Sequence, residues 1–330
     1  MKRQFEFFNW LMALAILFAV QSCSDDGVYE IPEAQSGLQN DLIKRSLGPN
    51  VVGSSINFAY AMAILSSEGK ITEASVEASI EGATGTVLEN KSYHSGANGV
   101  DVGVEIGDAA TTTGKVTKVT FTKDTSAATL RYTYVIPEAA KGKNVSFKFS
   151  AKSSNGQTIT YDAGPYTISS MDMQLDLIAK DASDAFISIS DLKIYSAAEA
   201  ANHTSDIDLV YLYRATPANF GHALVAPTAN SIYLPGVTLP SGASNNTKII
   251  KAFTVRDQQL ARLQYGVFVD DIDLKTKDFT DAPNFVTALT AEYGVWAETG
   301  DGKYRAYIYV NRVNPTTKEM TISIKRLQIK

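Results

Sequence analysis

The sequence predicts a mainly β protein of two domains, and three observations support this fold class. Apolar residues recur at every second position in most apolar runs, which is the period of a strand with one buried face. Clusters of Gly, Asn and Ser, such as residues 95–99, separate these runs at short intervals. The chain has 330 residues, 45% of them hydrophobic, which is enough for two separate cores.

Residues 51–168 are predicted to form an immunoglobulin-like β-sandwich. Five alternating runs carry this prediction: residues 56–64, 76–80, 100–106, 130–136 and 145–151. Each run is expected to bury one face and to expose the other to water. Seven or so short strands with regular turns in about 120 residues are typical of this sandwich. The Cys…Trp…Cys core of antibody domains is absent from this segment.

Residues 171–330 are predicted to form a mixed, mostly antiparallel β domain with short helical insertions. The strand-like runs of this domain cover residues 207–213, 265–269, 304–310 and 320–324. The last run continues through Leu327 and Ile329, where the apolar parity switches. A bulge near Lys325 and Arg326 would account for the switch.

Helix signals are few and short. Ser196 and Glu199 fit a capping box that begins a helix. Residues 38–47 show the spacing of one short amphipathic helix. Asp281 is predicted to cap a helix that presents Phe285, Ala288, Leu289 and Glu292. Residues 215–250 are rich in Pro, Gly, Ser and Asn, and a loop of that length is usually functional or disordered.

The start of the chain carries a secretion signal. Lys2 and Arg3 precede an unbroken apolar run over residues 10–20, and Cys23 soon follows as the one cysteine of the chain. The run is too short to cross a hydrocarbon core of about 30 Å, so residues 1–22 are predicted to be a lipoprotein signal peptide. Acylated Cys23 would anchor the chain to a membrane, and residues 23–50 would form an acidic tether. An incidental thiol is the alternative.

The residues at this cysteine add an expectation about location. The run Cys23-Ser24-Asp25-Asp26-Gly27 resembles the start of mature surface lipoproteins of the Bacteroidetes type. In that group, acidic residues after the cysteine direct export to the outer face of the outer membrane. The resemblance implies a lipid-anchored outer-membrane protein exposed at the cell surface, and a periplasm-facing protein is the alternative.

Short phrases of the second half carry a wider resemblance: residues 206–211 (DIDLVY), 226–227 (AP), 293–304 (YGVWAETGDGKY) and 322–325 (ISIK). In plan, the chain is similar to lipoproteins of unknown function from gut Bacteroidetes, which pair an immunoglobulin-like module with a second domain. It also resembles, more distantly, the SusE-like glycan-binding outer-membrane lipoproteins, which carry an immunoglobulin-like domain after the lipid anchor. Neither resemblance implies a catalytic residue.

Charge and motifs argue against a nucleic-acid partner and against an enzyme. The formal net charge is −5 at pH 7, and a mildly acidic surface does not favour nucleic acid. The three histidines, His94, His203 and His222, do not lie in an HExxH frame. The sequence also lacks a G-x-S-x-G elbow, a Walker loop and a G-x-G-x-x-G turn. We therefore expect no catalytic residue and no cofactor.

Four tyrosines are candidate ligand-binding residues: Tyr211, Tyr213, Tyr307 and Tyr309. Each pair lies on one strand face, where exposed rings stack on sugars or anchor a protein partner. Tyr307 and Tyr309 oppose an apolar face and are the better candidates for exposure. If buried, the same rings would simply fill the core.

Acidic residues suggest two further sites. Three of them form a weak candidate calcium site: Asp270, Asp271 and Asp273. The order of an EF-hand fails at Lys275 and Lys277, and solvated loop charge is the alternative. Asp206 and Asp208 point to one strand face, and two such carboxylates could serve a glycoside hydrolase.

Together these features favour a non-enzymatic, surface-anchored lipoprotein that acts as an accessory module. Its expected partners are the membrane, through the lipid anchor, and a glycan or a neighbouring outer-membrane protein. An adhesin-like or structural stalk protein is the alternative hypothesis. A carboxylate-dependent glycoside hydrolase is the third.

Overall fold

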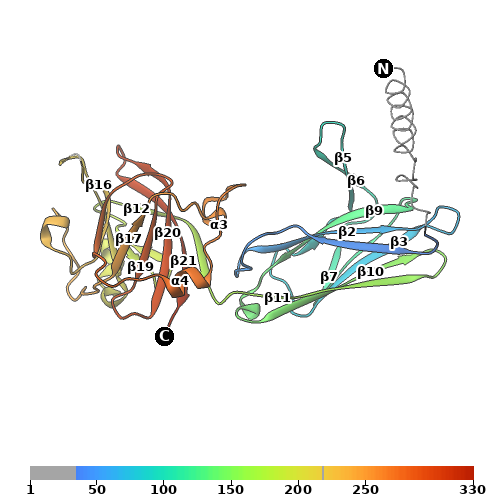
Figure 1. The fold of residues 1–330 in the computed structure, drawn as a ribbon, viewed down its shortest axis with the longest axis horizontal. Helices are drawn as coiled ribbons and strands as arrows, with labels where there is room; N and C mark the ends of the chain where they lie inside the picture. Colours follow the sequence, from blue (N-terminus) through green and yellow to red (C-terminus); the bar gives the residue numbers. More distant parts are fainter. Residues whose placement is uncertain (1–34, 218) are drawn as a thin grey trace, which may run out of the picture. The chain divides into compact units, whose positions relative to one another are not determined.

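The computed structural model describes residues 35–217 and 219–330 of the chain. The predicted signal peptide, Cys23 and residues 23–34 of the predicted tether lie outside the described residues. The described chain is mainly β, as predicted, with antiparallel sheets and a few short helices (Figure 1). Among these residues, no helix is long and apolar enough to span a bilayer.

The N-terminal part folds as a two-sheet sandwich, which confirms the predicted sandwich architecture. Its four-stranded sheet has the order β1 (Gln39–Lys44), β2 (Ser55–Ala63), β9 (Ala127–Val135) and β4 (Val87–Leu88). Its five-stranded sheet has the order β11 (Thr158–Thr167), β10 (Asn144–Ser153), β3 (Ile71–Ala78), β8 (Val116–Thr120) and β7 (Thr111–Thr113). Alternate residues of both sheets are buried in one shared apolar cluster, as the period-two pattern requires.

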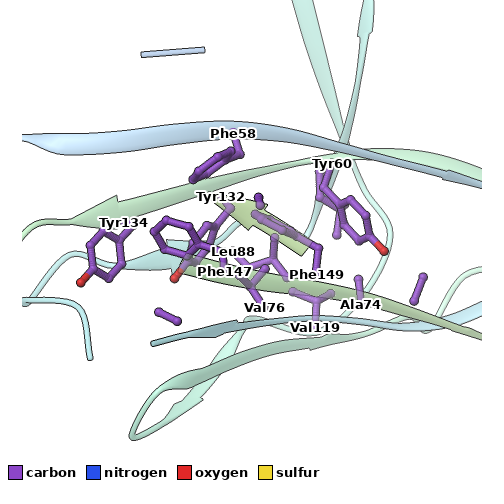
Figure 2. Packing of buried hydrophobic residues seen from close by; sticks show 14 of the residues in the cluster. Phe58, Tyr60, Ala74, Val76, Leu88, Val119, Tyr132, Tyr134, Phe147 and Phe149 are labelled. Atoms are coloured by element: carbon purple, nitrogen blue, oxygen red, sulfur yellow. The ribbon is translucent and has the colours of Figure 1, made fainter. Parts of the chain in front are cut away.

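Aromatic rings form the centre of this cluster (Figure 2). Phe58 of one sheet packs edge-on against Phe147 and Phe149 of the other, with ring centroids 5.0 and 5.2 Å apart. Tyr134 meets Phe147 in the same way at 4.9 Å. Edge-to-face pairs of this kind add about 0.5–1.5 kcal/mol each beyond the burial of their area. The sandwich therefore has a well-defined core without a disulfide bridge.

Two predictions for the N-terminal part are wrong. Residues 39–44, placed in the tether with a short helix over residues 38–47, form strand β1, whose backbone pairs with β2. The tertiary pairing along the edge of β2 outweighs a weak helical spacing. Strand β6 (Asp101–Glu105) pairs with β5 (Lys91–Ser95) in a separate hairpin. Its predicted buried face is exposed, because neither sheet of the sandwich covers it.

The C-terminal part contains two further five-stranded antiparallel sheets. The first has the order β12 (Asp172–Lys180), β21 (Glu319–Gln328), β20 (Tyr304–Asn314), β19 (Gly294–Glu298) and β17 (Lys248–Ala252). The second has the order β14 (Lys193–Tyr195), β13 (Phe186–Ser188), β15 (Leu209–Arg214), β16 (Gly221–Val225) and β18 (Phe285–Leu289). Their facing side chains form one apolar cluster, so this part is also built around two layers.

In residues 35–217 and 219–330, six short helical segments interrupt the strands: η1 (Glu138–Ala140), α2 (Ala197–Ala200), η2 (Thr204–Asp206), η3 (Ser231–Tyr233), α3 (Gln258–Ala261) and α4 (Asp271–Thr276). The predicted capping box of Ser196 and Glu199 is present at the start of α2. Leu260 of α3 and Leu274 of α4 pack with Tyr307 and Leu327 on the outer face of β20 and β21. Figure 1 shows α3 and α4 beside these strands. These helical insertions confirm the predicted mixed architecture.

Strand β21 is covered on both faces, which corrects the predicted bulge. Ile322 and Ile324 enter the cluster between the two sheets, whereas Lys325 and Leu327 are buried on the opposite face. Pairing of β21 with β20 is continuous past these residues. The register shift lies instead between Val310 and Arg312 of β20. The apolar parity changes because both faces of the strand are buried.

Two other element predictions in the C-terminal part are wrong. Residues 285–289 form strand β18, not a helix, and pair with β16. Ala288 has a positive φ of 51°, which a right-handed helix does not allow. Of the predicted strand over residues 265–269, the structure keeps one isolated bridge between Val267 and Asp257. For residues 285–289, pairing with β16, a strand distant in sequence, decides the conformation rather than local spacing.

Candidate functional site

Tyr307 and Tyr309 are buried, so the prediction that they are exposed is wrong. The Tyr307 side chain is 0% exposed and packs against Trp296 with the ring centroids 4.5 Å apart. Its hydroxyl donates a hydrogen bond to the Val255 carbonyl oxygen. Burial raises the pKa of both phenols. The segment with α3 covers this face of β20, and the rings are therefore core residues that cannot stack on a sugar.

Tyr211 and Tyr213 belong to the other sheet of the C-terminal part. Tyr211 is fully buried, and its hydroxyl lies 2.7 Å from His222 Nδ1. The half-buried Tyr213 ring lies 4.5 Å from the same imidazole, between centroids. Burial raises the pKa of Tyr211 and lowers the pKa of His222, which favours the neutral form of both groups. The contact between Tyr211 and His222 joins strands β15 and β16. The burial of Tyr211 leaves the predicted ligand contact without a physical basis.

Removal of the Tyr307 hydroxyl tests the core role. Tyr307→Phe is expected to lower the free energy of unfolding by about 1–2 kcal/mol, because the partly buried Val255 carbonyl loses its donor. Chemical denaturation measures the change. Tyr304→Phe, at a half-buried ring on the same strand, is the control and should stay within about 0.5 kcal/mol of wild type. Equal stability of Tyr307→Phe and wild type would contradict the assignment.

The candidate calcium residues form a helix cap instead. The Asp270 carboxylate accepts hydrogen bonds from the N–H groups of Ile272 at 2.9 Å and Asp273 at 3.1 Å. The Asp273 carboxylate accepts the N–H of Asp270 at 3.1 Å in return. Asp271 forms an ion pair with Lys275 at 2.6 Å. These carboxylates point at backbone amides and a lysine rather than at a common centre, so the geometry does not support the weak calcium hypothesis.

The two carboxylates of the hydrolase hypothesis have separate environments. Asp208 is 3% exposed, and its Oδ2 accepts the N–H of Ile189 at 2.7 Å. Burial raises the pKa of Asp208 to about 7, and nearby Asp301 adds to the rise. Asp206 is half-buried and lies 3.3 Å from His203 Nδ1. One carboxylate therefore holds a buried backbone segment, whereas the other lies at the surface.

An exposed aromatic group lies elsewhere on the C-terminal part, where β17 ends and β19 begins. Ala252 pairs with Gly294, which places Phe253 and Tyr293 next to each other. The two rings make an edge-to-face contact with centroids 5.4 Å apart, and Phe253 is 61% exposed. The Lys251 ammonium lies 5.2 Å from the Phe253 ring and 4.9 Å from the Tyr293 ring. We call Lys251, Phe253 and Tyr293 the Phe253 surface.

The backbone holds Lys251 in place over these rings. Its ammonium donates hydrogen bonds to the carbonyl oxygens of Thr287 and Ala288, both at 2.8 Å. Burial lowers the pKa of Lys251, although the partly exposed group keeps access to water. A cation held over two rings orients them and adds polar character to an otherwise apolar contact.

Charged and apolar residues follow or precede the Phe253 surface closely in the chain. Arg256 and Glu292, which follow Phe253 and precede Tyr293 in the chain, form an exposed ion pair. Tyr265 and Val267 are also exposed, and Val267 N–H donates to the carbonyl oxygen of Arg256 at 2.9 Å. The strand pattern did not single out Phe253 and Tyr293, because Phe253 lies just past the end of its strand and Tyr293 lies 40 positions further on. Only the pairing of β17 with β19 brings the two rings together.

Family models cover nearly all of the described chain. A domain of unknown function, DUF4466, matches residues 35–168, and a second, DUF8576, matches residues 169–329. No curated protein matches the chain.

Two solved structures provide the structural comparison. The chain is similar to the crystal structure of a DUF4466 family protein from Parabacteroides merdae. The two are 43% identical over 90% of this chain and 100% of that chain, with a TM-score of 0.85. The major pilin subunit BcpA of Bacillus cereus is 13% identical over 50% of this chain and 51% of that chain. Its TM-score is 0.29, too low to carry an argument.

Proposed function

The chain belongs to the DUF4466 family, whose function is unknown, and we propose that it is a non-enzymatic binding module that holds a glycan on the Phe253 surface. The observation that supports the proposal is the exposed Phe253 ring, fixed against Tyr293 by an edge-to-face contact. A ring already held in place loses little conformational entropy when a ligand binds to it.

The chemistry of the Phe253 surface matches that of a sugar. The apolar C–H face of a pyranose packs on a flat aromatic ring, and its hydroxyl groups need polar partners at the rim. Here the Arg256–Glu292 pair supplies donors and acceptors beside the ring. Such a mixture favours a glycan over a purely apolar ligand. The same combination of ring and polar groups is typical of a shallow, exposed binding surface rather than of a deep catalytic cleft.

The proposal includes an anchor at the cell envelope. The sequence supports lipidation of Cys23 after removal of residues 1–22, because a charged start and a short apolar run precede that cysteine. The acidic residues that follow favour the outer face of the outer membrane, with a periplasm-facing position as the alternative. A binding module at the surface would retain a glycan near the cell for other proteins to process.

Glycan-array binding by purified protein tests this function. Phe253→Ala is expected to weaken binding of the recognised glycan at least about fivefold, because loss of a ring contact removes about 1 kcal/mol or more. Tyr161→Ala is the matched control: it removes an exposed ring of β11 on the N-terminal sandwich and should leave binding unchanged. Array binding that survives Phe253→Ala at full strength would exclude the Phe253 surface.

A second candidate function, an adhesin-like protein contact, is favoured by the β5–β6 hairpin. Val100, Val102 and Val104 are all exposed, although valines of an antiparallel strand usually enter a core. Arg131 of β9 supports the hairpin through an ion pair with Asp101 and a contact with the Tyr93 ring, 3.7 Å from its centroid. An exposed apolar strand on a supported hairpin suits a protein partner. A glycan array without any signal for wild type would favour this candidate.

A further inference from the structure

Three potential metal ligands meet on the C-terminal part, apart from the Phe253 surface. Asp191, His203 and Asp206 each offer one ligand atom, and these atoms lie within 4.8 Å of one another. Asp191 lies in the turn between β13 and β14, whereas His203 and Asp206 lie at the two ends of the η2 segment. Residues from two separate segments therefore converge on one point of the surface.

A buried tyrosine orients this group. Tyr195 is 6% exposed and belongs to a small apolar cluster with Phe186 and Val210. Its hydroxyl donates a hydrogen bond to Asp191 Oδ2 at 2.5 Å. Its ring stacks on the His203 imidazole, with centroids 4.3 Å apart and planes 8° from parallel. One rigid ring thus positions two of the three ligands, as outer partners do at metal sites.

The charge around the group is unbalanced. Within the described residues, neither Asp191 nor Asp206 forms an ion pair with a lysine or an arginine, and the one ion-pair partner of Asp206 is His203. The carboxylates therefore create a negative potential, which a bound cation would neutralise.

We propose that Asp191, His203 and Asp206 bind a divalent first-row transition-metal ion of the zinc class. One imidazole nitrogen and two carboxylate oxygens are ligands that Zn²⁺ accepts, at bond lengths of about 2.0–2.2 Å. Calcium fits less well, because it takes about six to eight oxygen ligands and does not favour imidazole. Donor atoms of a tetrahedral zinc site lie about 3.3 Å apart. Small rotations of the exposed Asp191 side chain and of Asp206 would bring the atoms to that spacing.

The three histidines of the chain allow a matched test by isothermal titration calorimetry of ZnCl₂ into protein without an affinity tag. Wild type is expected to bind one ion per chain. His203→Ala and Asp206→Asn should each weaken binding at least about tenfold. His94→Ala removes an exposed histidine of β5 and should bind zinc like wild type. A large excess of CaCl₂ should not displace the zinc.

Three outcomes would overturn the proposal. Wild type could bind no zinc, His203→Ala could bind it as tightly as wild type does, or calcium could displace it. Circular dichroism verifies that each variant folds. Asp191→Asn, at an exposed turn residue, provides the same test if His203→Ala does not fold. None of these results depends on whether a glycan binds at the Phe253 surface.

Discussion

Lys325→Met is expected to lower the free energy of unfolding of the C-terminal part by about 3–5 kcal/mol. Lys325 of β21 and Asp257 at the start of α3 are both 0% exposed, and Lys325 Nζ lies 2.6 Å from Asp257 Oδ2. The ammonium also donates to the Val269 carbonyl oxygen at 3.1 Å. Burial lowers the pKa of Lys325, and Asp257 opposes that change. Without the lysine, Asp257 would remain as a buried charge without its cation.

A second substitution separates the charge from the packing. Asp257 also accepts the Leu260 N–H at 2.8 Å and the Val269 N–H at 2.7 Å. Asn in its place keeps one acceptor but carries no charge. Lys325→Met combined with Asp257→Asn is therefore expected to recover more than half of the loss. If the double variant is no more stable than Lys325→Met, the uncompensated carboxylate is not the cause.

Denaturation followed by Trp296 fluorescence measures these effects, because Trp296 lies in the apolar cluster beneath α3 and α4. The other tryptophan, Trp10, lies in the predicted signal peptide, so protein without residues 1–22 reports on Trp296 alone. Lys275→Met is the matched control, since Lys275 forms an exposed pair with Asp271 and such pairs contribute about 1 kcal/mol or less. A loss below about 1 kcal/mol for Lys325→Met would contradict the argument.

Asp208→Asn is expected to stabilise the protein at pH 8 by about 3–4 kcal/mol, and to have little effect at pH 4. Burial raises the pKa of Asp208 from its ordinary value of 3.8 to about 7. Between these values the folded state keeps the proton that the unfolded state has lost. Wild-type stability due to this group therefore falls as pH rises from about 4 to about 7, then stays level. The neutral amide mimics the protonated carboxyl at every pH.

Free energies of unfolding measured across this pH range give the difference between variant and wild type. The difference isolates Asp208, because all other groups titrate in both proteins. Asp184→Asn, at an exposed residue beyond β12, is the control for the loss of one carboxylate. A pH-independent difference for Asp208→Asn would mean that the carboxyl is ionised at the same pH in the folded and unfolded chains.

Much of the strand content could be predicted from residue types alone. The alternating runs of the N-terminal part became β2, β3, β9 and β10, and a single apolar cluster forms between the two sheets. Strands whose spacing carried no period-two signal were missed. Residues 39–44 and 285–289 join sheets because neighbouring strands offer unpaired backbone groups, a requirement that local spacing does not report.

The Phe253 surface could not be predicted from the sequence. Whether a side chain is exposed depends on whether another layer of the protein covers its face of the sheet. The alternation of residues placed Tyr307 on the strand face opposite the apolar residues, which predicted that its ring is exposed to solvent. The segment with α3 and α4 covers that face instead. Burial of Lys325 was missed for the same reason, since a lysine in an alternating strand normally points to water. Conversely, Phe253 is exposed although it follows a strand with an apolar run.

By itself, the sequence determined the fold class and the positions of the strands with a clear period-two pattern, because these follow from local periodicity and composition. The tertiary structure alone decided which tyrosines are buried, where Phe253 meets Tyr293 and how Asp191 reaches His203. Such contacts join residues from separate segments, and their geometry depends on strand order and on which layer covers each sheet. No local pattern contains that information.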